Sequence, residues 1–148
     1  MRHPTKKPKL RAAFHAGGLR LTRQRMAIYR ELEGRYDHPD VERIFQAVKP
    51  RIPKISLFTV YRAMNALEGA GLVWRVATWR GHARYDANTG THMHFLCENC
   101  GRIDDVASGA VDIPIPALPN SKAVVRRMDV MMTGSCEACV ARTAQRQA

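Results

Sequence analysis

The cysteines offer the clearest chemistry in the sequence. They form two C-x-x-C pairs separated by 35 residues, and the four positions are Cys97, Cys100, Cys136 and Cys139. A C-x-x-C turn can direct both sulfurs at one ion, and a structural zinc ion takes four soft ligands in a tetrahedron. The pairs therefore predict one Zn2+ site that joins two distant segments and stabilises a small domain.

Two other uses of these thiols stay open at this point. The four thiols could carry no metal, or one C-x-x-C pair could act as a thioredoxin-like redox centre. Redox motifs use a single pair that opens a helix after a strand, whereas this chain has two matched pairs. The N-terminus also lacks the apolar core of an export signal, and thiols kept inside a cell favour metal over disulfides. Structural zinc is the interpretation that both observations favour.

A second candidate site lies just before the first cysteine pair. His92 and His94 flank Met93, and on a β-strand this i, i+2 spacing places both imidazoles on one face. Such a pair can bind a metal ion, or it can simply form the polar face of a strand. The pair alone does not decide between these two readings.

The first half of the chain must supply a different kind of scaffold. Apolar spacing, N-cap residues and proline or glycine stops predict three helices, over residues 22–34, 39–50 and 56–69. Two strand-like runs follow at 72–76 and 82–85, with Arg80-Gly81 as the turn between them. Three helices followed by a hairpin are typical of a winged helix-turn-helix, whose last helix enters the major groove of DNA.

The third predicted helix is the candidate recognition helix. With the residue just before it, it would offer five polar side chains to DNA: Lys54, Ser56, Thr59, Tyr61 and Arg62. Arginine can read guanine with two hydrogen bonds, while tyrosine and threonine can contact thymine methyl groups or phosphates. An ordinary solvated helix face is the alternative reading of the same pattern.

The charge distribution points to the same half of the chain. The formal net charge is +11; residues 1–88 hold 18 Lys and Arg against 7 Asp and Glu, and residues 89–148 hold 6 of each. A basic part joined to a neutral part suggests a polyanion-binding module attached to a control or assembly module. No apolar run approaches the roughly 20 residues of a membrane span, so we expect a cytoplasmic protein with no membrane partner.

Several short motifs occur in the order found in the ferric uptake regulator family, and the chain resembles that family from about residue 17 to 139. The motifs are Leu21-Thr22-x-Gln24-Arg25, His38-Pro39, Thr59-Val60-Tyr61-Arg62, Gly71-Leu72-Val73 and Cys97-Glu98-Asn99-Cys100-Gly101. The resemblance implies an α+β protein. It would have a winged helix-turn-helix domain with a basic N-terminal arm (1–86) and a small α/β dimerisation domain with the four-cysteine zinc site (87–148). It also implies a homodimer that represses at palindromic double-stranded DNA operators.

The resemblance further implies a regulatory metal site built from scattered residues. Position by position, the family ligands match His38, Asp86, His92, His94 and Asp105. The neighbouring Asp104 would point to the opposite face of a strand. Three imidazoles and two carboxylates are borderline-to-hard ligands, which suit Fe2+ or Mn2+.

Asp86 bears on the signal that such a regulator would sense. Iron-sensing members of the family commonly have Glu at the matching position, whereas peroxide-sensing members have Asp, so the chain resembles the peroxide-sensing branch. The resemblance then implies that bound Fe(II) reacts with hydrogen peroxide and that His38 and His92 are the oxidation-sensitive residues.

Other functions remain as alternatives. The first is a regulator of iron, manganese or zinc uptake without peroxide chemistry. A more distant one is a zinc-ribbon redox or metal-trafficking protein with an incidental basic arm, which would need reactive thiols. We do not expect an enzyme, because the sequence has no evident nucleophile–base pairing or phosphate-binding glycine loop.

Overall fold

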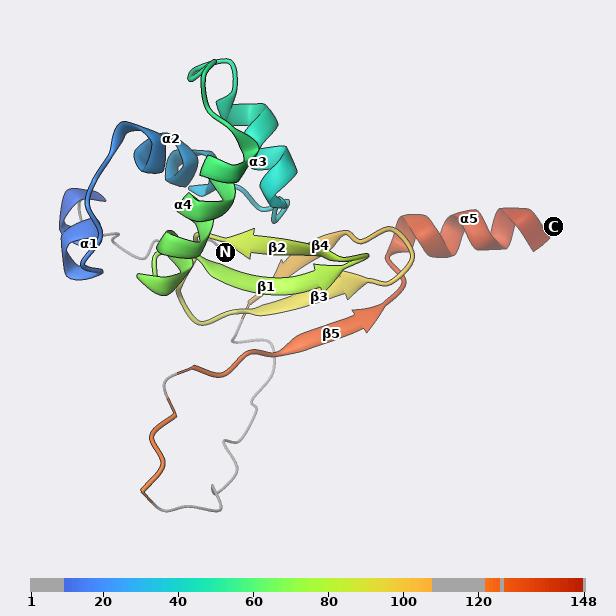
Figure 1. Cartoon of the computed structure of the whole chain (residues 1–148). Helices are drawn as coiled ribbons and strands as arrows, with labels where there is room; N and C mark the ends of the chain where they lie inside the picture. Colours follow the sequence, from blue (N-terminus) through green and yellow to red (C-terminus); the bar gives the residue numbers. More distant parts are fainter. Residues whose placement is uncertain (1–9, 108–121, 126, 148) are drawn as a thin grey trace. The chain divides into compact units, whose positions relative to one another are not determined.

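The computed structural model describes residues 10–107, 122–125 and 127–147, so the basic arm expected at residues 2–11 lies mostly outside the described part. The chain divides into two compact units, Met1–Gly90 and Thr91–Ala148 (Figure 1). The boundary predicted from the sequence, between residues 86 and 87, lies slightly earlier. Among the helices of the described residues, none is both long and apolar enough to cross a membrane.

The first unit contains four helices and a hairpin. The helices are α1 (Leu10–Ala16), α2 (Arg23–Leu32), α3 (Val41–Val48) and α4 (Leu57–Gly69). The side chains of Thr22, Asp40 and Ser56 cap α2, α3 and α4 by accepting hydrogen bonds from backbone N–H groups in the first turn. These caps confirm the predicted starts at Thr22 and Ser56, and they place the start of α3 just after Pro39.

Helix α1 was not predicted from the sequence. It falls where the basic arm was expected to give way to the first helix, and its Phe14 is buried against Tyr29 with the two rings 6.0 Å apart. The helix therefore belongs to the hydrophobic core of the first unit. The largest core side chains from α2, α3 and α4 are fully buried: Ile28, Leu32, Ile44, Val48, Val60, Met64 and Leu67.

The predicted hairpin is confirmed. Strand β1 (Trp74–Trp79) pairs antiparallel with β2 (His82–Asp86), and Trp79 lies opposite His82. Arg80 and Gly81 both have positive φ, 49° and 81°, as the tightest hairpin turns require. Strand β1 begins later than expected, because Gly71, at φ 70°, and Leu72 form the turn that ends α4, where the Leu72 N–H donates to the Leu67 carbonyl.

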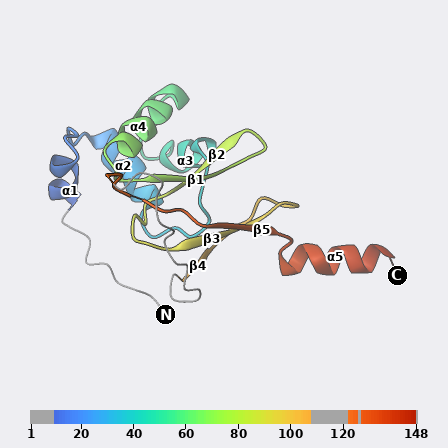
Figure 2. The ribbon, with the colours of Figure 1, turned by 90° about the horizontal axis from the view of Figure 1, so that it is seen from below.

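The second unit is a three-stranded sheet followed by a helix. Strand β3 (Met93–Cys97) is central, with β4 (Ile103–Val106) antiparallel on one side and β5 (Met131–Gly134) parallel on the other. Helix α5 (Glu137–Gln147) leaves the end of β5 in both views (Figure 2). Since β3 and β5 are parallel, their carboxyl ends meet at one edge, with Cys97 opposite Gly134. This pairing brings the two cysteine motifs together.

Candidate metal centres and nucleic-acid interface

The four cysteines form one compact group in the second unit. Their sulfur atoms all lie within 4.8 Å of one another, and the Sγ atoms of Cys100 and Cys136 are 3.8 Å apart. A tetrahedron with zinc–sulfur bonds of about 2.3 Å has sulfur–sulfur edges of about 3.8 Å. All four cysteines are reduced rather than joined in disulfides. The donor set therefore fits a tetrahedral zinc ion.

The backbone prepares these sulfurs to bind a cation. The Cys136 N–H donates to the Cys97 Sγ at 3.2 Å, and this bond is the largest of the contacts that lower the pKa of the buried Cys97 thiol to about 6. Gly101, at φ 73°, completes the first turn by donating its N–H to the Cys97 carbonyl at 2.8 Å. A thiolate is the form that binds a metal, so the turn favours the binding-competent state.

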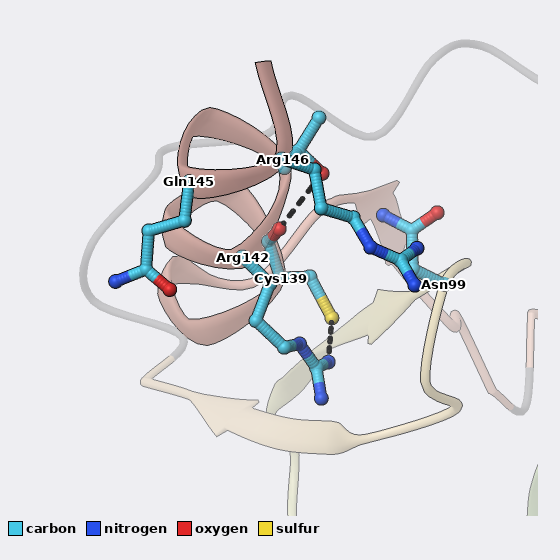
Figure 3. A pocket seen from close by; sticks show the side chains of 6 residues that line it. Asn99, Cys139, Arg142, Gln145 and Arg146 are labelled. Carbon is cyan, nitrogen blue, oxygen red and sulfur yellow. Dashed lines mark hydrogen bonds between the residues drawn. The ribbon is translucent and has the colours of Figure 1, made fainter. Parts of the chain in front are cut away.

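An arginine on α5 also contacts the cluster. The Arg142 guanidinium donates to the Cys139 Sγ at 2.8 Å, across a shallow pocket that Asn99 and Arg146 also line (Figure 3). Burial raises the pKa of Cys139, and the bond from Arg142 opposes that effect. Four thiolates around one divalent cation leave a net negative charge, which this guanidinium partly offsets. Arg142 was not predicted from the sequence, although its i+3 spacing from Cys139 on a helix is a usable signal.

Of the residues expected at the regulatory site, two lie in the first unit. His38 and Asp86 are both almost fully buried, with 3.6 Å between His38 Nε2 and Asp86 Oδ2. His38 has a φ of 45°, an uncommon value for a non-glycine residue that costs on the order of 1 kcal/mol. The surrounding structure must therefore hold this backbone in place.

Strand β2 supplies that support. The buried Arg84 guanidinium donates to the carbonyl of His38 and, at 2.7 Å, to the carbonyl of Asp37. The next residue, Tyr85, donates its N–H to the Pro39 carbonyl at 3.1 Å. Burial lowers the pKa of Arg84, but a guanidinium begins so high that it keeps its charge. Arg84 was not predicted from the sequence, because its partners lie 46 and 47 residues away.

The other three expected ligands lie together in the second unit. Asp105 Oδ1 is 3.6 Å from His92 Nε2 and 3.7 Å from His94 Nε2, and the two imidazole rings are 4.4 Å apart. The strand register explains the grouping, since His94 lies directly opposite Asp105. Asp104 does not join the group and instead accepts a hydrogen bond from Arg102 at 2.8 Å. Two of the five expected residues therefore belong to the first unit and three to the second.

The candidate recognition residues lie at the start of α4. Lys54, Ser56, Tyr61 and Arg62 are exposed, and Thr59 is half-buried. Ser56 and Thr59 are hydrogen-bonded to each other. Ser56 Oγ accepts the Thr59 N–H at 3.1 Å, and the two hydroxyl oxygens are 2.8 Å apart. Arg62 extends over the ring of Phe58 at 5.9 Å. Phe58, which was not predicted, is 69% exposed and adds an apolar contact surface to this helix.

A third group of potential ligands lies beside α4. Asp40, Glu42 and His82 have ligand atoms within 4.8 Å of one another. Two of them already serve the fold, since Asp40 caps α3 and Glu42 accepts a hydrogen bond from the Tyr61 hydroxyl at 2.6 Å. This group therefore belongs to the contact between α3, α4 and the β1–β2 hairpin, which is the wing, and we do not assign a metal to it.

Comparison with known proteins agrees with these features. The model of the ferric uptake regulator family matches residues 16–128. The peroxide-responsive repressor PerR of Staphylococcus epidermidis is 37% identical over 94 residues, which cover 64% of this chain and 63% of that protein, less than two thirds of its length.

Solved structures share the fold. The ferric uptake regulator of Helicobacter pylori aligns with a TM-score of 0.66 at 23% identity, over 88% of this chain and 89% of that one. The peroxide stress regulator of Campylobacter jejuni aligns with a TM-score of 0.64 at 24% identity, over 88% and 96%. The family is one of regulators and not of enzymes. The chain therefore belongs to the ferric uptake regulator family and has its α+β fold, with an N-terminal helical unit and a C-terminal β-rich unit that carries a four-cysteine cluster.

Proposed function

We propose that the protein is a metal-dependent transcriptional repressor that binds palindromic double-stranded DNA operators as a homodimer. In this proposal the four cysteines hold a structural Zn2+. A second ion, Fe2+ or Mn2+, is the corepressor. Helix α4 enters the major groove, with Lys54, Ser56, Thr59, Tyr61 and Arg62 at the DNA.

The observation that carries this proposal is the division of imidazole and carboxylate donors between the two units. His38 and Asp86 form one set, and His92, His94 and Asp105 form the other. The second set offers two imidazoles and one carboxylate, and the first adds one imidazole and one carboxylate, so that together they supply five borderline-to-hard donors of the kind that suits Fe2+ or Mn2+. One ion held by both sets would fix the DNA-binding units of a dimer at one separation. Metal would then stabilise the DNA-competent state over the others.

We further propose that hydrogen peroxide is the signal. Asp86 matches the peroxide-sensing branch, and the Staphylococcus epidermidis relative is named a peroxide-responsive repressor. When bound, Fe(II) would supply the electron that splits peroxide into hydroxide and a hydroxyl radical. His38 and His92 are the imidazoles to which the hydroxyl radical would add; the adduct would then lose one electron, to Fe(III), and one proton, and so keep one added oxygen atom. An oxidised imidazole is a poorer ligand, so one set of donors would no longer bind the metal ion. The protein would then release DNA.

A regulator of metal uptake without peroxide chemistry is the second candidate. This candidate would use the same cysteine cluster and the same two donor sets. A structure of a zinc-bound manganese uptake regulator shares the fold at 26% identity with a TM-score of 0.58. The two candidates differ in whether the iron form is consumed by peroxide.

The test begins with selection of duplexes from a random pool by the Mn(II)-loaded protein. Binding of the selected duplex is then measured for the Fe(II) and Mn(II) forms, before and after brief exposure to hydrogen peroxide, with mass spectrometry of His38 and His92. Loss of binding only in the iron form, with one added oxygen on either histidine, is the expected result. Metal-dependent binding that survives peroxide would support the uptake regulator, and binding that ignores metal would contradict both candidates.

A further inference from the structure

Glu42 is an acidic side chain in contact with two elements that a winged helix presents to DNA. It lies in the first turn of α3, and its Oε1 accepts the hydrogen bond from the Tyr61 hydroxyl of α4 at 2.6 Å. Its Oε2 lies 3.6 Å from His82 Nδ1 at the start of β2 in the wing. One carboxylate therefore contacts both the candidate recognition helix and the wing.

Neither stability nor general DNA affinity explains this carboxylate well. Tyr61 is 40% exposed and the Glu42 side chain is 41% exposed, and bonds between exposed groups contribute little to stability. A negative charge near the phosphate backbone also weakens the electrostatic part of binding. The first unit is strongly basic, so an acid at this place opposes the general trend of its surface. A specific role for the contact with Tyr61 would account for a carboxylate at this position.

The direction of the hydrogen bond gives that role. A tyrosine hydroxyl has one proton to donate and two lone pairs to accept with. Here the proton is directed at Glu42, and the bond raises the pKa of Tyr61 to about 12, so the phenol stays protonated. The lone pairs of this oxygen are then left to accept hydrogen bonds.

In the major groove, acceptors and donors read different bases. An acceptor can receive the amino group of adenine or cytosine, whereas guanine and phosphate present acceptors and require a donor. A Tyr61 that keeps its proton on Glu42 can therefore discriminate in favour of adenine or cytosine. A Tyr61 released from Glu42 could also donate, and it would accept guanine or phosphate as partners.

We propose that Glu42 is a positioning residue that fixes Tyr61 as a hydrogen-bond acceptor toward DNA and so sets the base preference at one operator position. This inference rests on the proposed function, in which α4 enters the major groove. Glu42 does not touch the base in this arrangement and acts only through Tyr61.

The first experiment compares operator preferences of the Mn(II)-loaded full chain, selected from a random duplex pool, for the wild type and four variants. Y61F should lose the preference for adenine or cytosine at one position, by about five-fold, the effect of one hydrogen bond. E42L should lose the same preference, and E42L/Y61F should lose no more than either alone. E42Q should keep it, because a glutamine oxygen can still accept the tyrosine proton.

A charge control separates positioning from electrostatics. Glu33 is an exposed carboxylate at the C-terminal end of α2, and E33Q removes the same charge without touching Tyr61. E42Q should raise affinity for all duplexes and leave the preference intact, whereas a loss of preference in E42Q would overturn the proposal. The proposal would also be overturned if E42L kept the wild-type preference, or if the losses in E42L and Y61F added together in E42L/Y61F.

A measurement without any Glu42 variant covers the case in which E42L does not fold. Replacing the selected adenine by purine, or the selected cytosine by 2-pyrimidinone, removes the amino donor. Wild-type binding should weaken by about five-fold and Y61F binding should not change. An equal loss in both proteins, or a Tyr61-dependent preference for guanine, would overturn the proposal. If the wild type selects no sequence, the proposed function itself fails, which is a different outcome.

Discussion

The two sets of potential metal ligands differ in whether all of their residues belong to one folded unit. The four cysteines all belong to the second unit, where parallel pairing of β3 with β5 brings both turns to one edge of the sheet. The imidazole and carboxylate donors are instead divided, with His38 and Asp86 in the first unit and His92, His94 and Asp105 in the second. A site within one unit can stabilise that unit, whereas donors divided between units can couple metal to their arrangement.

The largest expected effect is loss of the cysteine cluster. Changing Cys97 to Ser should remove zinc and unfold the second unit, because structural zinc contributes about 10 kcal/mol or more in small domains. We expect the melting temperature to fall by more than about 10 °C, at about 4–8 °C per kcal/mol for a domain of this size. Zinc content and thermal melting measure this, and an unchanged melting temperature would contradict the structural role.

Loss of a histidine or carboxylate donor should affect Mn(II) and DNA binding and leave zinc binding unchanged. Changing His94 to Ala should weaken Mn(II) binding by at least about ten-fold and abolish metal-dependent DNA binding, while zinc content stays unchanged. D104N is the matched control for D105N, since Asp104 bonds Arg102 and lies outside the histidine group. Calorimetry with Mn(II) should separate these two variants. Equal losses in D104N and D105N would remove the distinction between the two aspartates.

Arg84 tests whether the backbone at His38 is part of the site. Changing it to Lys keeps the charge but loses the fork that holds the carbonyls of Asp37 and His38. We expect Mn(II) affinity to fall by about ten-fold, the usual effect of losing support behind a ligand. Mn(II) titration of R84K checks this, and wild-type affinity would mean that the loop is held by other contacts.

Asp86 tests the proposed signal. Changing it to Glu should keep metal-dependent DNA binding but slow the loss of binding on peroxide treatment, by a few-fold, because a longer carboxylate alters the position of the donor. Time courses of operator release from the Fe(II) form measure this. Equal rates in D86E and the wild type would argue against the link between Asp86 and peroxide.

Arg142 tests the contact that supports the cysteine cluster from α5. R142Q should release zinc to a chelator about ten-fold faster, as for other contacts behind metal ligands, with little change in fold. R146Q is the matched control, since Arg146 lines the same pocket while the bond to the Cys139 sulfur comes from Arg142. Release rates that are the same in R142Q and R146Q would show that the Arg142 contact does not matter for zinc retention.

Local patterns explain which features could be predicted from the sequence. The N-caps at Thr22 and Ser56, the Arg80-Gly81 turn and the two C-x-x-C pairs are each defined by a few neighbouring residues, so the helices, the hairpin and the cysteine cluster followed from them. Helix α1 was missed because its seven residues begin within a basic segment, which hid the apolar signal of Phe14.

The remaining features depend on contacts between distant residues. Arg84 reaches Asp37 and His38, and Tyr61 reaches Glu42 across 19 residues, and neither pairing leaves a periodic signal. His38 and Asp86 could be grouped only through resemblance to a family. The choice of Asp105 over Asp104 also rested on that resemblance, because strand alternation places the two carboxylates on opposite faces without saying which one shares a face with His94. The register that sets Asp105 opposite His94 comes from the structure.

In the proposed function, one ion binds donors from both units. Pulsed electron–nuclear double resonance on the protein loaded with one Mn(II) per chain tests this directly, with H38Q and H92Q as variants from the two units. We predict that each variant removes one coupled imidazole nitrogen from the same Mn(II) signal. A signal that changes in H92Q but is identical to the wild type in H38Q would contradict the shared ion.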